Sequence, residues 1–309
     1  MTARLVEMEK AELHVHLEGS IRPATLQEIA PEFTMREIEE RYRFHDFPGF
    51  LVSYKWVTSL LNGPAPYSLA TRRLIEELAV QNVRYAEINL SVGVILRRNH
   101  DAAAIFDAVN SAAKKGPVKV RWVFDAVRQF GPAEAMRVVE LAAERTSDGV
   151  VAFGMGGDES QYNSEEFASV FAFARRRGLC ITPHAGETTN AESVWGALRL
   201  GANRIGHGIR AVEDPALLRH LRDHDIPLEI CITSNVATGS VPSLAAHPLR
   251  AIFDAGVPVV LNTDDPAMFG TTLNREYELA ATRFGFSEAE LEHIVKNGFR
   301  YAFSASDTS

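Results

Sequence analysis

Two histidines near the N-terminus occur at a spacing that suits metal binding. His14 and His16 alternate with Leu13, Val15 and Leu17. Both imidazoles therefore project from the same side of a β-strand. A single inward-facing histidine is more often a hydrogen-bonded core residue than a metal ligand. Two imidazoles at positions i and i+2 of an apolar strand favour two nitrogen ligands for one metal ion.

More histidine and carboxylate side chains follow three later β-rich runs, near the point where each run ends. These residues are His184, Glu187, His207, Asp264 and Asp265. Nitrogen and oxygen ligands without thiolate fit Zn²⁺ with an open position for water. Some two-metal hydrolases bridge their ions with a modified lysine after the fourth strand. No lysine stands there in this chain, so we expect one zinc ion.

The other histidines and the two cysteines have less specific settings. Cys180 and Cys231 fall inside β-rich runs, and we expect small core residues there. Six further histidines lie in helical or loop segments and are expected at the surface. They are His45, His100, His220, His224, His247 and His293.

The elements that must position these groups alternate along the chain. Eight β-rich runs are expected at 12–17, 83–91, 119–127, 150–157, 180–187, 204–209, 227–235 and 258–265, with helical spacing between them. Eight βα units predict an α/β protein with a (β/α)₈ TIM barrel of the metal-dependent hydrolase type, as a single catalytic domain over 1–309. Barrel enzymes assemble their sites at the carboxyl ends of the strands, where the polar groups fall.

An open doubly wound sheet is the alternative fold. Such sheets normally carry a G-x-G-x-x-G turn after the first strand. Here the first run ends in His-Leu-Glu-Gly-Ser, and the G-x-G-G run at 154–157 has its third glycine misplaced. The barrel is therefore favoured.

A long connection follows the first strand and predicts a helical lid insertion at about 30–65. Within it, Phe47, Phe50, Leu51 and Tyr54 are spaced i, i+3, i+4 and i+7, which places them on one face of a helix. An amphipathic helix that simply packs on the barrel is the more common explanation of such a stripe. A position above the strand ends favours a lid.

Composition excludes several classes of protein. The chain of 309 residues has 32 Lys+Arg and 40 Asp+Glu, a net charge of −8, which argues against non-specific nucleic-acid binding. No run of 18 apolar residues and no signal-peptide pattern occurs, so no membrane contact is expected. Two cysteines suit a reducing cytoplasm. The oligomeric state stays open, because a barrel closes its own sheet edges.

Five motifs together resemble the adenosine deaminase family of zinc-dependent purine deaminases. They are H-V-H-L-E-G at 14–19, G-D-E at 157–159, H-A-G-E at 184–187, R-I-G-H-G at 204–208 and T-D-D-P at 263–266. Each motif alone is a weak indication of the family, but five motifs in the family's order over nearly the whole chain are a specific one.

The resemblance implies a zinc site and a purine site. Its zinc ligands would be His14, His16, His184 and Asp264, and a small purine would be the substrate. The residues 47, 50, 51 and 54 would form the family's apolar gate, with His16 also beside the substrate.

The same resemblance implies how the ring is held and attacked. Glu187 would give a proton to purine N1, and His207 would orient or deprotonate the attacking water. Asp265 would donate a hydrogen bond to N7, and the Gly157 backbone N–H would meet N3. Glu187 and Asp265 must then be protonated, which burial favours. Asp264 must instead be an anion on the metal.

Glu18 bears on the choice of substrate, because adenosine deaminases proper usually carry Asp there, facing the ribose 5′-hydroxyl. We predict hydrolytic conversion of the 6-amino group of an adenosine-like nucleoside, such as adenosine or 6-amino-6-deoxyfutalosine, to 6-oxo with release of ammonia. Adenine deaminase is the alternative. AMP is disfavoured because Arg22 is the only cation evident near the end of the first strand. A zinc amidase or esterase and a non-catalytic metal-binding protein are the alternatives from other classes.

Overall fold

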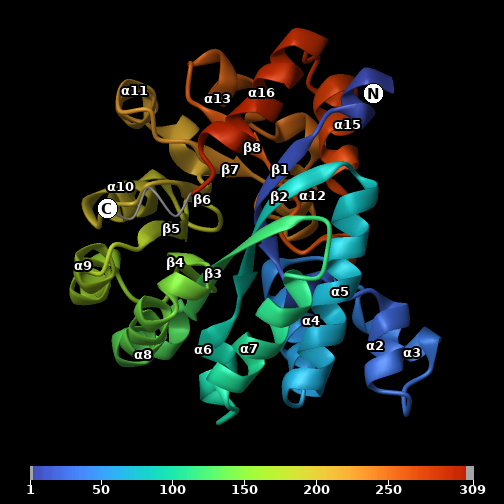
Figure 1. Ribbon diagram of the computed structural model, residues 1–309. Coiled ribbons are helices and arrows are strands. Elements are labelled where there is room, and N and C mark those ends of the chain that lie inside the picture. The colour runs from blue at the N-terminus through green and yellow to red at the C-terminus, as the bar shows by residue number, and fades with distance from the viewer. Residues whose placement is uncertain (1–2, 304–309) are drawn as a thin grey trace.

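Eight parallel strands form a nearly closed barrel surrounded by helices (Figure 1). This computed structural model describes residues 3–303. The strands follow one another around the barrel in chain order, which confirms the predicted (β/α)₈ fold. They are β1 (Lys10–His16), β2 (Val83–Leu90), β3 (Lys119–Val127), β4 (Val150–Gly156), β5 (Cys180–Ala185), β6 (Ile205–His207), β7 (Leu228–Ile230) and β8 (Val259–Leu261).

Helices cover the outside of the barrel and follow most strands. They are α1 (Ala3–Glu7), α5 (Pro64–Val80), α6 (Val92–Arg97), α7 (Ala102–Ala113), α8 (Gly131–Glu144), α9 (Ala168–Arg176), α10 (Ala191–Arg199), α11 (Pro215–Asp223), α12 (Ile232–Ala237), α13 (Leu249–Asp254), α14 (Pro266–Phe269), α15 (Leu273–Arg283) and α16 (Glu288–Arg300). Among residues 3–303, no helix has the length and apolar character needed to cross a membrane. Cys180 and Cys231 are buried, as expected of core residues.

The last strands are shorter than the sequence predicts. The run 227–235 was expected to be extended throughout, but β7 ends at Ile230 and α12 begins at Ile232. Glu276 of α15 explains the change, because its carboxylate accepts hydrogen bonds from the Thr233 N–H at 3.1 Å and the Thr233 hydroxyl at 2.5 Å. Such a carboxylate satisfies a backbone donor in the first turn of the helix.

The insertion after β1 is helical. It contains α2 (Pro23–Ile29), α3 (Met35–Arg41) and α4 (Phe47–Leu60), and Figure 1 shows α2 and α3 at the outside of the molecule next to α4 and α5. The Asp46 side chain caps α4 by accepting from the Gly49 N–H at 2.8 Å. Phe50 packs inward against the rings of Phe44 and Phe269.

The barrel closes between β8 and β1 through a loop rather than through strand pairing. The His16 N–H donates to the Asp264 carbonyl at 2.8 Å, and the Asp264 N–H donates to the His14 carbonyl at 2.9 Å. Asp264 has a φ of 65°, a left-handed conformation that is uncommon outside glycine. This closure places three of the predicted metal ligands side by side.

Candidate metal and catalytic site

The predicted metal ligands converge at the carboxyl ends of the strands. Ligand atoms of His14, His16 and Asp264 lie within 4.8 Å of one another, as do those of His14, His184 and His207. The Nε2 atoms of His14 and His16 are each 3.4 Å from the same oxygen of Asp264. All five side chains are nearly inaccessible to solvent.

The donor set fits a metal ion. His14 Nε2 and His207 Nε2 are buried, and neither has a hydrogen-bond partner among the described residues. Leaving a buried polar atom unpaired costs about 1–3 kcal/mol, which a bound cation would remove at His14. Imidazole and carboxylate ligands without thiolate suit Zn²⁺. The opposite nitrogen of His14 contacts Glu229 at 2.7 Å, so Nε2 faces the centre.

A hydrogen-bond chain fixes the proton on His207. The Leu249 N–H donates to His247 Nδ1 at 3.1 Å, so neutral His247 carries its proton on Nε2. That proton is directed at the Asn235 carbonyl oxygen at 3.2 Å, and the Asn235 amide nitrogen then donates to His207 Nδ1 at 3.0 Å. Burial lowers the pKa of His207 to about 4. Neutral His207 therefore presents an N–H from Nε2, which favours orienting water over deprotonating it.

The surface position predicted for His247 is wrong, because this side chain is 5% exposed. It lies beneath the site and connects to His207 through Asn235. Sequence spacing gave no sign of this role, because His247 precedes a helix and follows the barrel strand β7 by many residues. Ser234, next to Asn235, donates to Asp264 at 2.6 Å.

Glu187 lies in the loop after β5, held there by Glu159. The Glu159 carboxylate accepts from the N–H groups of Gly186 and Glu187, each at 2.8 Å, and from Thr188, Thr189 and Ser193. One Glu187 oxygen is 3.6 Å from His207 Nε2. Burial, and then the charge of Asp264, raise the pKa of Glu187 well above its ordinary value. This shift favours the neutral form of Glu187.

The pKa values of two adjacent aspartates are shifted in opposite directions. The pKa of Asp265 is raised far above its ordinary value by burial and by the charge of Asp264. Burial opposes ionisation of Asp264 as well, but His14, His207 and His16 hold its pKa well below the ordinary value. Strand β8 has already ended, so both side chains serve one site. Gly19 makes room for Asp265, because a Cβ there would lie 1.7 Å from the carboxyl oxygen.

A cavity of about 250 Å³ opens beside these groups. The four predicted residues of α4 line one wall, and Gly157, with a φ of 96°, lies on another. The cavity is also lined by His16, His184, Glu187, Asp264 and Asp265. The predicted helix therefore packs on the barrel and also borders the cavity.

Glu18 does not line the cavity. Its carboxylate is fully buried and accepts from the Ser91 N–H at 3.1 Å and the Tyr54 hydroxyl at 3.3 Å. Ser91 and Tyr54 themselves form the wall. The extra methylene of Glu18, relative to Asp, is accommodated behind that wall.

Sequence reasoning missed Asp125, which lines the cavity from β3. Burial raises its pKa to about 8, and its Oδ1 has no hydrogen-bond partner among the described residues. The available signal was a lone carboxylate inside an otherwise apolar strand, between Phe124 and Ala126.

The outer part of the cavity carries positive charge. Lys55, Arg97 and Arg98 line it, and none of them forms an ion pair with a carboxylate of residues 3–303. Arg22 instead pairs with Glu77 at 2.5 Å. The sequence indicated Arg22 as the only cation near the end of the first strand, but the cations that line the cavity are Lys55 of α4, Arg97 at the end of α6 and Arg98, which follows α6.

The sequence profile of the adenosine deaminase family matches residues 9–309. The chain belongs to the adenosine deaminase family. It is accordingly a hydrolase that removes an amino group by cleaving a C–N bond, acting on an adenine-type substrate. The resemblance of its five motifs to this family is confirmed.

Family relatives with curated names differ in substrate. An aminodeoxyfutalosine deaminase of Streptomyces avermitilis is 40% identical over 96% of this chain and 87% of its own. An adenine deaminase of Rhizobium johnstonii is 37% identical over 97% of this chain and 96% of its own. An amidohydrolase structure from Burkholderia ambifaria with bound Zn has a TM-score of 0.91 at 26% identity, covering 100% of this chain and 90% of that one.

Proposed function

We propose that this chain is a deaminase with one zinc ion that converts the 6-amino group of an adenosine-like nucleoside to a 6-oxo group, releasing ammonia. The observation that carries the proposal is the pair of buried carboxyl groups, Glu187 and Asp265, that line one cavity with Asp264: burial raises the pKa of the first two, whereas nearby imidazoles lower the pKa of Asp264. A zinc amidase or esterase has no need of two such donors.

The metal would be held by His14, His16, His184 and Asp264. Zinc bound there supplies the Lewis acidity that activates water at neutral pH. The similar structure with bound Zn supports this choice of metal.

The other residues of the cavity bind the ring and move protons. Glu187 gives its proton to N1 as water adds at C6, because the ring resists attack until N1 is protonated. Asp265 donates to N7, and the Gly157 N–H meets N3. His207 orients the water through its Nε2–H. One proton of the water passes to the amino group and the other to the Glu187 carboxylate. The C6–N bond then breaks, ammonia leaves, and the oxygen stays on C6 as the 6-oxo group.

A nucleoside with a substituent on its sugar is the substrate class that we favour over a free base. Beyond the metal end, Phe47, Leu51 and Phe130 continue the cavity to the cationic outer part formed by Lys55, Arg97 and Arg98. A bare purine would leave that outer part without contacts. Similarity to the Streptomyces avermitilis aminodeoxyfutalosine deaminase supports the same choice.

Adenine is the second candidate, because the Rhizobium johnstonii relative named adenine deaminase is nearly as similar. The test is the ultraviolet change from 6-aminopurine to 6-oxopurine, measured with aminodeoxyfutalosine, adenosine, adenine and AMP in parallel. We expect the highest kcat/KM with one of the two nucleosides. A higher value with adenine or AMP would refute the nucleoside assignment, and no change with any of the four would refute the function.

A further inference from the structure

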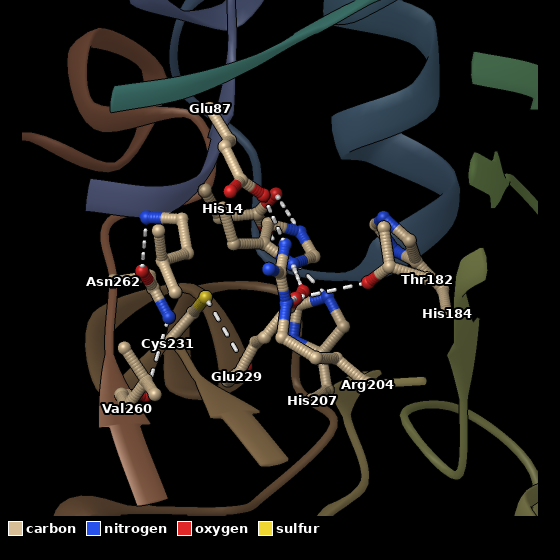
Figure 2. A network of polar contacts seen from close by, with 12 residues as sticks. His14, Glu87, Thr182, His184, Arg204, His207, Glu229, Cys231, Val260 and Asn262 are labelled. Atoms are coloured by element: carbon tan, nitrogen blue, oxygen red, sulfur yellow. Dashed lines mark hydrogen bonds and ion pairs between the residues drawn. The ribbon is translucent and has the colours of Figure 1, made fainter. Parts of the chain in front are cut away.

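A buried polar network extends from the metal site down through the barrel (Figure 2). His14 Nδ1 contacts one oxygen of Glu229 at 2.7 Å. The other oxygen of Glu229 accepts from Arg204 Nε at 2.5 Å and from the Thr182 hydroxyl at 2.9 Å. Both Glu229 oxygens are thus occupied, and the carboxylate has one orientation behind His14.

Residues 301–303, the last that the structure describes, contact the side of Arg204 that faces away from Glu229. Its guanidinium pairs with Glu87, which Figure 2 shows on the opposite side from Glu229, and it donates to the Tyr301 carbonyl at 2.7 Å. The Phe303 ring lies over the guanidinium, with its centroid 3.5 Å from the central carbon. The Phe303 N–H also donates to Glu87 at 2.5 Å.

The charges explain why this arrangement matters for His14. Glu229 is buried, and its ion pair with Arg204 at 2.5 Å leaves its other oxygen facing His14 Nδ1 at 2.7 Å. An anionic Glu229 holds the proton of His14 on Nδ1 and leaves the Nε2 lone pair for a metal ion. Carboxylates behind a histidine ligand orient the ring and raise its basicity.

We propose that Arg204 and Phe303 are positioning residues for the metal centre: the segment 301–303 orients Arg204, Arg204 orients Glu229, and Glu229 sets how tightly His14 holds zinc. The proposal rests on the proposed zinc site and assigns the C-terminal segment a role in metal retention. It is distinct from a role in stability alone, because a buried ion pair is weak evidence for stability.

The rate of zinc release distinguishes a positioning role at the metal centre from a role in stability alone. The zinc-loaded full chain is mixed with excess chromogenic chelator, and the release rate is followed without substrate. For Glu229→Gln we expect release faster by about 10–100-fold, the usual effect of losing such a partner. For Phe303→Ala and Arg204→Lys we expect a smaller increase, about 3–10-fold, because the anion remains but is less well oriented.

Phe286→Ala is the matched control. Phe286 is 5% exposed, against 6% for Phe303, and it likewise lies under an arginine, with Arg250 at 4.5 Å. It has no contact with Glu229 or His14 in the described hydrogen bonds. Urea unfolding of each variant measures the loss of stability. We expect Phe286→Ala to lose comparable stability and to release zinc at the wild-type rate.

Equal release from Phe303→Ala and wild type would overturn the proposal, as would equally accelerated release from Phe286→Ala. If Arg204→Lys fails to fold, the series Phe303→Leu and Phe303→Ala must show graded release for the proposal to hold. The readout needs no turnover, so an absence of deaminase activity would contradict the proposed function while leaving this result intact.

Discussion

At the scale of single residues, protonation decides the chemistry. Glu187, Asp264 and Asp265 are all carboxylic acids in one buried site, yet the pKa of Asp264 is lowered well below its ordinary value and the pKa values of the other two are raised well above it. Burial disfavours charge on all three, and the neighbouring imidazoles stabilise the anion only at Asp264. Formal charge at neutral pH therefore misrepresents two of the groups on which the proposed mechanism depends.

Glu187→Gln tests the proton donor. The amide keeps the size and hydrogen bonds of the side chain but cannot transfer its proton. We expect kcat to fall about 10²–10⁴-fold, the range for a lost general acid, while zinc content stays unchanged. Full turnover by a zinc-loaded Glu187→Gln protein would rule out the assignment.

Asn235→Asp tests the proton position on His207. A carboxylate there accepts from His207 Nδ1–H, which moves the proton away from Nε2. We expect nitrogen NMR of labelled histidine to show His207 protonated on Nε2 in the wild type and on Nδ1 in the variant. Activity should fall about 10²-fold or more, as when an oriented donor is removed. A wild-type spectrum with the proton on Nδ1 would contradict the hydrogen-bond chain.

At the scale of elements, one face of α4 both packs against the core and lines the cavity. Phe50 packs between Phe44 and Phe269, whereas Leu51 is only partly buried and borders the cavity. The apolar spacing predicted the helix and four of its residues that line the cavity, but not Lys55 and Thr58, which line it as well. It did not predict the helix α12, because the β-branched residues at 232–233 favour a strand. A contact with Glu276, 43 residues away, gives the helix its start instead.

Alanine substitutions should separate the two roles of α4. Phe50→Ala is expected to lower the free energy of unfolding by about 3–5 kcal/mol, the cost of a large cavity in a core. Leu51→Ala should cost less than half of that and should chiefly raise KM. Urea unfolding and steady-state kinetics on both variants provide the check. A larger loss of stability from Leu51→Ala than from Phe50→Ala would contradict the packing described.

At the scale of the whole molecule, the barrel explains which site residues could be predicted from the sequence and which could not. Residues that end a strand are recognisable as polar groups after apolar runs, so the sequence could predict that the proposed ligands and Glu187 lie together. Their supporting residues were not, because Glu159, Arg204 and His247 are joined to them only by the closed barrel. The net charge of −8 says little about the site, because three cations, Lys55, Arg97 and Arg98, line its cavity.

Metal content and activity, measured on the same preparation, test the central claim most directly. The purified chain should contain one zinc ion and deaminate a 6-aminopurine nucleoside. Dialysis against a chelator should remove zinc and activity in proportion, and added Zn²⁺ should restore both, because the water is activated by the metal. Full activity in a preparation shown to contain no metal would contradict the account.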